Sequence, residues 1–243
     1  MDTAAYPTLI PSFEHQRLQA LQPYQVLGTP GQGLFNDLVG VVAKLFAAPI
    51  ALVSLVRAAD VVFVGNAGLP EATGANREDS LCSVAILQDG LTMFDDLVAQ
   101  PCAHINPLAT RQMQLRFYAG QALRTPDGQP LGTLCVIDRV ARQFSEAEGH
   151  LLTQLAAVAE DLLRLQAALL NNSPLTEALR TRLDAALVPS LTRLETLAQL
   201  RSWEPNSETT PAQQYQQSYF DEAGYLTAAL HRELQATIKE FGA

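Results

Sequence analysis

The stretch that most constrains the fold is LRFYAGQALRTPDGQPLGTLCVID, at residues Leu115–Asp138. Two runs of apolar and aromatic residues flank the turn sequence TPDGQPLG. An Asp-Gly pair between two such arms predicts a β-hairpin, because glycine accepts the backbone conformation that a tight turn requires. Side chains alternate between the two faces of a strand. The first arm therefore has one face made of Phe117, Ala119 and Leu123 and another made of Tyr118, Gly120 and Ala122.

Three shorter apolar runs predict further strands. IALVSLV (Ile50–Val56) is almost continuously apolar and β-branched, which is typical of a strand buried on both faces. VVFV (Val61–Val64) follows it after a turn, so these two runs predict a second hairpin, and LTMF (Leu91–Phe94) predicts a short strand. The segments 65–79 and 99–114 contain the turn-forming residues Gly or Pro and predict long loops. Loops of this length in compact domains usually carry function or move.

Helical patterns precede and follow these strands, with apolar residues at helical spacing. The predicted helices cover residues 12–22, 29–48, 80–88, 145–170, 176–201 and 211–241. Ser80 can cap the short third helix, and Pro189 is expected to kink the fifth. The last two helices predict an antiparallel pair.

The helix at residues 145–170 has the clearest pattern. Ser145 and Glu148 have the spacing of a capping box, and Phe144 precedes the cap as a hydrophobic staple. Its apolar residues are spaced alternately by four and three positions, as in the seam of a two-stranded coiled coil. They are Leu151, Leu155, Val158, Leu162, Leu165 and Leu169. So narrow a seam favours a partner helix, and we expect charged residues at Leu155 and Leu162 to disrupt that pairing.

Composition excludes several classes of function. The net charge of −9 and pI near 4.9 disfavour nucleic acid and anionic membranes as partners, because both require a basic surface. No run approaches the roughly 20 apolar residues of a membrane span, and the first residues lack the pattern of a secretion signal. Three cysteines without a C-x-x-C spacing are typical of reduced cytosolic thiols. We therefore expect a cytoplasmic protein.

Five stretches, taken in order, resemble a bacterial GAF domain of the stand-alone or histidine-kinase-associated type. They are Arg17–Pro30, Leu34–Val56, Arg77–Leu87, Asn106–Leu123 and Leu131–Asp138. The resemblance covers about residues 14–170. It implies an α+β fold in which a central antiparallel β-sheet is flanked by helices, with a small-molecule pocket on one face. The predicted organisation is a tail at 1–12, a GAF-like sensory domain at 13–170 and a C-terminal α-helical extension at 171–243.

The resemblance also implies which residues contact a ligand. Carried over to this chain, they are Arg77, Ser80, Cys82, Asp95, Asn106, Arg116 and Tyr118. The chain departs from the family pattern where relatives often have a histidine, here Val84, and where they have a Trp-Phe pair, here Val62 and Phe63. It also departs at Gln100–Ile105, before the Asn-Pro-Leu motif. These departures lie in segments that should contact the ligand, so neither ligand nor cofactor is named by the sequence.

The cysteines leave alternatives open. Cys82 could anchor a bilin or act as a redox thiol, but buried free cysteines usually behave as small apolar residues. Cys102, two residues from His104 on an irregular segment, is expected to be the more exposed and reactive thiol. Cys82 and Cys102 are the plausible pair for a reductase of GAF fold acting on free methionine sulfoxide.

Charged residues have two interpretations each. Asp95 and Asp96 could act as acid and base or bind a metal with His104, although no metal-ligand spacing supports a metal site and none is expected. Arg116 could clamp a carboxylate or phosphate, or pair with Asp95 or Asp138. His231 lies on an amphipathic helix and could accept a phosphoryl group, although a surface histidine is the simpler interpretation.

Together these features predict a non-catalytic regulator that binds a small molecule and signals through its terminal helices. The expected partners are a second copy of the chain, through those helices, and a downstream signalling protein. The alternative is a thiol-based redox enzyme of GAF fold or a phosphotransfer protein acting through His231.

Overall fold

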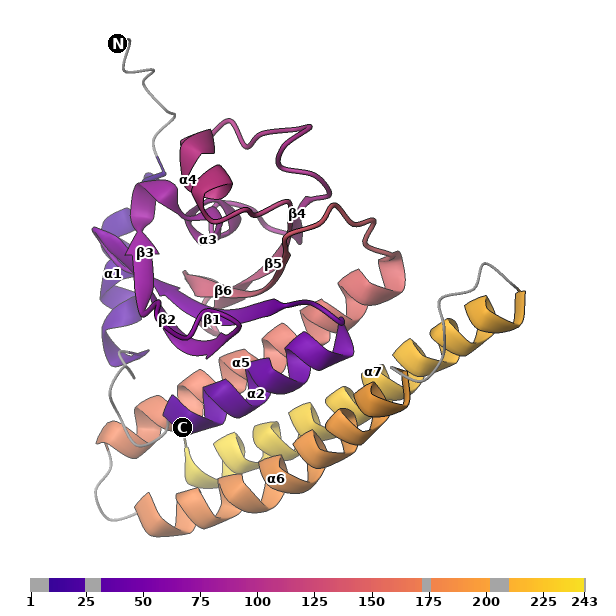
Figure 1. The fold of residues 1–243 in the computed structure, drawn as a ribbon. Coiled ribbons are helices and arrows are strands. Elements are labelled where there is room, and N and C mark those ends of the chain that lie inside the picture. The colour runs from indigo at the N-terminus through magenta and orange to yellow at the C-terminus, as the bar shows by residue number, and fades with distance from the viewer. Residues whose placement is uncertain (1–8, 25–31, 172–175, 202–209, 243) are drawn as a thin grey trace.

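A six-stranded antiparallel sheet lies at the centre of the computed structural model, which describes residues 9–24, 32–171, 176–201 and 210–242 (Figure 1). The strand order is β3–β2–β1–β6–β5–β4. The strands are β1 (Ile50–Val56), β2 (Asp60–Ala67), β3 (Gly74–Asn76), β4 (Thr92–Phe94), β5 (Phe117–Arg124) and β6 (Pro130–Asp138). Because β1 pairs with β6, two hairpins distant in the sequence form the middle of one sheet.

Both predicted hairpins are confirmed. β1 pairs with β2, and β5 pairs with β6 from Phe117–Asp138 to Arg124–Pro130. At the tip of the second hairpin Gly128 has a φ of +86°, and its amide donates to the carbonyl of Thr125 at 2.8 Å. β3 was predicted as part of a loop, because three residues are too few to show a strand pattern.

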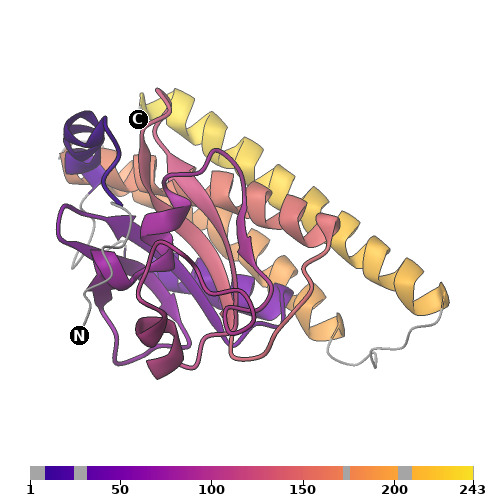
Figure 2. The ribbon, with the colours of Figure 1, turned by 90° about the horizontal axis from the view of Figure 1, so that it is seen from above.

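Helices cover the two faces of the sheet unequally (Figures 1 and 2). They are α1 (Glu14–Leu21), α2 (Gln32–Leu45), α3 (Leu81–Ala85), α4 (Pro107–Gln112), α5 (Glu146–Asn171), α6 (Thr176–Arg201) and α7 (Thr210–Phe241), with 3-10 turns η1 (Gln22–Tyr24) and η2 (Arg77–Asp79). The long helices α2, α5, α6 and α7 lie on one side, whereas α3 and α4 lie on the other. Residues 1–8 of the predicted tail and the connections at 172–175 and 202–209 lie outside the described residues.

The predicted start of α5 is confirmed. The Ser145 amide donates to Glu148 Oε2 at 2.8 Å, and the Glu148 amide donates to Ser145 Oγ at 3.2 Å. Phe144 packs against the rings of Phe46 and Phe117, with centroid distances of 5.5 and 5.4 Å. This capping box and its adjacent ring contacts fix where α5 begins relative to β5 and α2.

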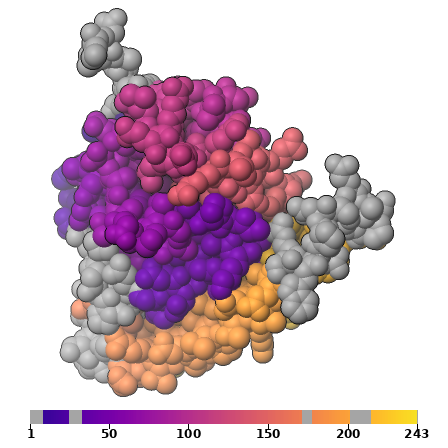
Figure 3. All heavy atoms as spheres, in the orientation of Figure 1, coloured from indigo at the N-terminus to yellow at the C-terminus, as the bar shows by residue number. Residues whose placement is uncertain are grey.

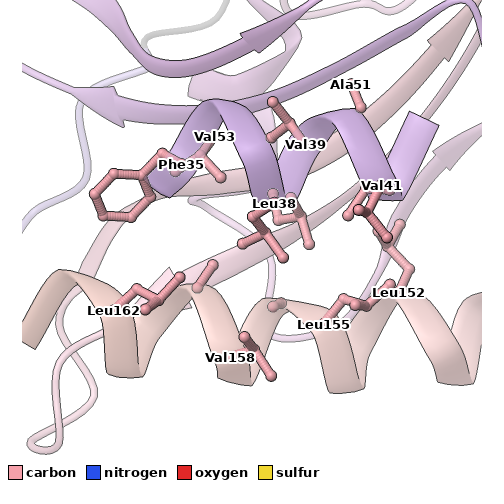
Figure 4. Packing of buried hydrophobic residues seen from close by; sticks show 14 of the residues in the cluster. Phe35, Leu38, Val39, Val41, Ala51, Val53, Leu152, Leu155, Val158 and Leu162 are labelled. Atoms are coloured by element: carbon pink, nitrogen blue, oxygen red, sulfur yellow. The ribbon is translucent and has the colours of Figure 1, made fainter. Parts of the chain in front are cut away.

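The apolar seam of α5 is buried within the chain itself. Leu155 is fully buried and Leu162 is 2% exposed, and both belong to a cluster shared by the sheet, α2, α6 and α7. Figure 4 shows this cluster where α2 faces α5. The partner helices of the seam are therefore α2 and α7 of the same chain. A homodimer through the terminal helices stays a prediction, and it would have to use other surfaces of these helices.

The two C-terminal helices pack onto the helical face as a second layer. α6 lies against α2 and α7 lies against α5, and the atoms of α2 and α6 are in contact in Figure 3. Leu187 of α6 and Leu234 of α7 are buried in the common cluster. The hydroxyl of Tyr219 donates to the carbonyl of Leu45 at the end of α2, at 3.0 Å. The helical extension thus shares the hydrophobic core of the sheet.

Gly132 tests how tightly β1 and β6 approach each other. A Cβ at Gly132 would lie 1.8 Å from the carbonyl oxygen of Ser54, so alanine requires the main chain to move. We expect Gly132→Ala to lower the free energy of unfolding by about 2 kcal/mol or more, measured by urea denaturation. At Gly40 in α2 a Cβ meets nothing within 4 Å, so Gly40→Ala should raise stability by up to about 1 kcal/mol. Equal stability of the two variants would contradict this packing.

Candidate functional site

The face of the sheet opposite the long helices is covered by α3, α4 and irregular segments. Buried apolar side chains fill most of the space beneath them, among them Leu52, Phe63, Leu81, Ile86, Leu97, Ile105 and Ile137. Most of the predicted pocket region is therefore a second hydrophobic core. Two features on this side are not apolar filling: a buried polar cluster beneath α3 and a cavity beside β4.

The buried polar cluster, here called the thiol cluster, consists of Ser54, Cys82, Tyr118, Thr133 and Cys135. Cys82 Sγ lies 4.0 Å from Cys135 Sγ, and the hydroxyls of Ser54 and Thr133 are 2.9 Å apart. All five side chains are almost fully buried. The cluster therefore joins α3 to the three central strands β1, β5 and β6.

Local sequence explains why these groups meet. Ser80 caps α3 by accepting a hydrogen bond from the Cys82 amide at 3.3 Å, which fixes Cys82 in the first turn. Gly120 and Cys135 are paired in the sheet, and the ring of Tyr118 lies where a Cβ on Gly120 would be, with Tyr118 Oη 2.3 Å from that position. The Tyr118 ring can therefore occupy this position only because residue 120 has no side chain.

Burial and mutual contact shift the acidities in the thiol cluster. The Cys135 thiol, by hydrogen bonding to Cys82, lowers the pKa of Cys82 to about 6, against the opposing effect of burial. The same contact raises the pKa of Cys135 well above its usual value, and burial adds to that increase. Burial also raises the pKa of Tyr118 well above 10. One thiol of the pair thus favours the thiolate, and the other keeps its proton.

The cavity beside β4, here called the β4 cavity, has a volume of about 350 Å³. It is lined by Val84, Gln88, Leu91, Thr92, Met93, Phe94, Pro101, Cys102, Ala103 and His104. Two of these lining residues each contain a buried polar atom that has no hydrogen-bond partner among the described residues: Thr92 Oγ1 and His104 Nδ1. None of the lining residues is Lys, Arg, Asp or Glu. Polar and apolar groups contribute to the wall in similar measure, so a ligand there could make both hydrogen bonds and apolar contacts.

A wider depression of about 700 Å³ lies beside the end of α2, on the helical side. Most of its lining residues are small, such as Gly40, Ala43 and Ala47, and Lys44 and Asp138 also line it. It carries none of the unpartnered buried polar atoms found in the described residues. The β4 cavity is therefore the better candidate site.

The structure divides the predicted ligand-contacting residues into two groups. Ser80, Cys82 and Tyr118 lie together in or next to the thiol cluster. Asn106 instead caps α4, where its side chain accepts from the Leu108 amide at 2.9 Å. Asp95 is exposed, and its carbonyl accepts from the Arg142 amide. Neither Asn106 nor Asp95 lines the β4 cavity.

The two predicted arginines form ion pairs away from the cavity. Arg77 is buried and pairs with Glu14 of α1, and it also donates to the carbonyl of Leu9 at 3.0 Å. Burial raises the pKa of Glu14, but hydrogen bonds from Arg17 and Arg77 outweigh burial and lower it to about 2. Arg116 forms a two-pronged pair at the surface with Asp96, rather than with Asp95 or Asp138 as the alternative predicted.

The cysteine predictions need correction. Cys102 was expected to be exposed, but it is 5% exposed because its segment folds back over the sheet. The thiol that approaches Cys82 is that of Cys135, not of Cys102. The alternation of side chains along the hairpin could have predicted that Cys135 lies on the same face as Tyr118, because Cys135 pairs with Gly120, which shares a face with Tyr118. In the described parts of the chain, no group of three or more His, Cys, Asp or Glu side chains could hold a metal ion.

His231 faces a buried carboxylate between α5 and α7. Its Nδ1 lies 2.8 Å from Asp161 Oδ2, and Gln235 Nε2 donates to Asp161 Oδ1 at 2.6 Å. The Asp161 side chain is 3% exposed and that of His231 is 38% exposed. Burial raises the pKa of Asp161 to about 6, although His231 and Arg164 act in the opposite direction. His231 is therefore a partly exposed residue whose Nδ1 is directed at the helix interface.

Comparison with known proteins identifies a family pattern over more than half of the chain: the GAF domain pattern matches residues 31–163. A cyclic di-GMP phosphodiesterase from Pseudomonas aeruginosa is 32% identical over 155 residues, which is 64% of this chain and 25% of that protein. The chain thus spans about a quarter of the length of that relative.

In the described parts of the chain, no helix is both long and apolar enough to cross a membrane.

The chain is also similar, at low identity, to solved structures. The GAF domain of the Acinetobacter phosphoenolpyruvate-protein phosphotransferase is 14% identical, with a TM-score of 0.49, covering 67% of this chain and 99% of that chain. The free methionine-R-sulfoxide reductase of Neisseria meningitidis, solved with its substrate, is 20% identical with a TM-score of 0.47. That match covers 62% of this chain and 85% of the reductase.

Substituting each of the two arginines in turn tests whether Arg77 is a buried structural residue and Arg116 a surface residue. Removing Arg77 takes away one of the two arginine partners of Glu14 and leaves the carbonyls of Leu9 and Arg57 without this buried donor. We expect Arg77→Ala to cost about 3 kcal/mol or more in urea denaturation. Arg116→Ala should stay close to wild-type stability, because the side chain is 42% exposed and its partner Asp96 can be solvated. A larger loss for Arg116→Ala than for Arg77→Ala would contradict these assignments.

Asp161 predicts a pH dependence of stability. In the folded chain the pKa of Asp161 is about 6, above the usual 3.8. Its contribution to the free energy of unfolding is therefore fully present below pH 3.8 and is lost as the pH rises through 6. Relative to Asp161→Asn, wild type should lose at most about 3 kcal/mol between pH 4 and pH 7. Denaturation at several pH values measures this difference, with Asp184→Asn on the exposed side of α6 as the control. A pH-independent difference would contradict the raised pKa.

Proposed function

This chain belongs to the GAF-domain family, and we propose that it is a non-catalytic, cytoplasmic sensory module that binds a small molecule in the β4 cavity. The observation that carries the proposal is that the β4 cavity is lined by both Thr92 and His104, whose buried Oγ1 and Nδ1 atoms have no hydrogen-bond partner among the described residues. Leaving such groups unpaired costs about 1–3 kcal/mol each. A ligand with matching hydrogen-bonding groups would recover that cost.

The volume and charge of the cavity restrict the ligand. A volume of about 350 Å³ is at the small end of the range for small-molecule sites. Phosphate groups are usually recognised by Arg, Lys or helix N-termini, and no Arg or Lys lines this cavity. We therefore infer a compact, uncharged ligand of one or two rings, with both a hydrogen-bond donor and an acceptor.

The sheet supplies a route from the cavity to the helices. Thr92 and Phe94 of β4 line the cavity, and β4 pairs with β5. On its other face, β5 places Phe117 in the cluster that contains α5. Ligand binding changes the helices only if the ligand prefers one of two arrangements. A displacement of β4 would change the packing of β5 against α5, and through α5 the packing of α7, which is the signal we propose.

The wall of the cavity lacks an activated nucleophile, which supports a binding role. Cys102 and His104 both line the cavity, but His104 Nδ1 has no hydrogen-bond partner among the described residues. A catalytic thiol requires an adjacent base or cation that stabilises the thiolate. The partners that we propose remain a second copy of the chain and a downstream signalling protein. Exposed apolar side chains of the terminal helices, such as Val188 and Tyr225, are available for them.

Native mass spectrometry of protein purified from its own host tests the cavity. Wild type should retain an additional mass, and Ala103→Trp should lose it, because the indole would fill the cavity that Ala103 lines. Val140→Trp places the same ring on an exposed position outside the lining and should retain the mass.

A panel of uncharged one- and two-ring heterocycles provides the second measurement. Amide NMR signals of Val84 and Thr92 should shift in wild type and in Val140→Trp but not in Ala103→Trp. If no mass is retained and no compound moves these signals, the cavity does not bind such ligands.

A further inference from the structure

Cys82 and Cys135 lie close together in the thiol cluster, and the proposed ligand binding in the β4 cavity assigns them no role. Cys82 comes from a helix of five residues, α3, whereas Cys135 lies in β6, which is paired on both sides with β1 and β5. The two sulfur atoms are 4.0 Å apart in a region where both side chains are almost completely buried. A disulfide requires sulfurs at about 2.05 Å, so the gap to close is about 2 Å.

α3 is the side of the pair that can move. β6 is held by hydrogen bonds to two neighbouring strands. α3 has one turn and a half, and its residue Val84, which packs in the second hydrophobic core, also lines the β4 cavity. A rotation of the Cys82 side chain, together with a small shift of α3, would bring the sulfurs into bonding distance.

The acidities of the pair favour this chemistry. The thiolate is the nucleophile in thiol oxidation, and contact with Cys135 lowers the pKa of Cys82 to about 6. At neutral pH Cys82 is therefore the reactive thiol, and Cys135, whose pKa is raised, supplies a protonated second thiol. Ser54, Thr133 and Ser80 also stabilise the Cys82 thiolate.

We propose that Cys82 and Cys135 form a reversible disulfide that makes this domain responsive to hydroperoxides. Cys82 Sγ attacks one peroxide oxygen, the O–O bond breaks, and the leaving oxygen takes a proton to become water or an alcohol. Cys135 Sγ then attacks the sulfur of the resulting sulfenic acid. The S–O bond breaks as the S–S bond forms, and the departing hydroxide takes the Cys135 proton to become water.

The reaction is balanced in electrons and protons. Two thiols lose two electrons and two protons in total, and one hydroperoxide is reduced by the same two electrons. A dithiol reductant restores both thiols by exchange. The bond would tie α3 to β6 and thereby move Val84 in the wall of the β4 cavity. Formation of the disulfide itself does not depend on any ligand of that cavity.

Peptide mapping of the folded full chain after treatment with hydrogen peroxide tests the proposal. Trypsin places Cys82 and Cys102 in one peptide, residues 78–111, and Cys135 in another, residues 125–139. Wild type and Cys102→Ser should both yield these two peptides joined by a bond that dithiothreitol cleaves. In the Cys102→Ser chain the bond can come only from Cys82. Cys82→Ser and Cys135→Ser should yield the peptides unlinked.

The pH dependence of the reaction gives a readout that incidental oxidation would not share. The rate of cross-linking should fall about tenfold per pH unit below pH 6 and level off above it, following the thiolate of Cys82. The proposal is wrong if wild type keeps both thiols free for alkylation after oxidation. It is also wrong if Cys102→Ser abolishes the link, or if the rate rises steadily to pH 8.5 as for an ordinary thiol. The wild-type measurement decides the first point even where a variant fails to fold.

Discussion

The structure depends on burying both faces of the strand pair β1–β6. Every residue of β1 and of β6 is buried, which requires a cover on each side of the sheet. The long helices supply one cover as a continuous apolar layer. α3, α4 and the loops supply the other, through a smaller cluster in which polar groups are enclosed. The asymmetry places the larger apolar core on one side of the sheet and the thiol cluster and the β4 cavity on the other.

The C-terminal helices belong to the side with the larger apolar core. α6 and α7 complete the burial of α2 and α5, which would otherwise expose the seam at Leu155 and Leu162. A buried carboxylate, Asp161, lies inside this helical layer and is matched by His231 and Gln235. Buried charges require specific partners, so these contacts favour one register of α7 on α5. The signal that we propose would pass from β5 to α5 and from α5 to α7, since these elements pack in that order.

Much of the fold could be predicted from the sequence, because its signals are local. The Ser145–Glu148 box and the Asp-Gly turn each determine a structure within a few residues. β3 and α4 were missed because they are short, although Asn106 before Pro107 is a start signal for a helix. The site was harder to predict, since it depends on contacts across the sheet. No local pattern shows that Cys82 meets Cys135, or that Thr92 and His104 line one cavity.

We infer that the sheet and the four long helices form one cooperative unit, so that a change beside β4 alters the packing of α7. Native-state hydrogen exchange measures this most directly, because it gives the free energy of opening for each amide. We expect amides near Leu230 and Leu234 in α7 to open with the same free energy as those of β1 and β6, because all of them open in the global unfolding of the chain. If α6 and α7 exchange through a separate opening of much lower free energy, the helices are an independent appendage and the account is contradicted.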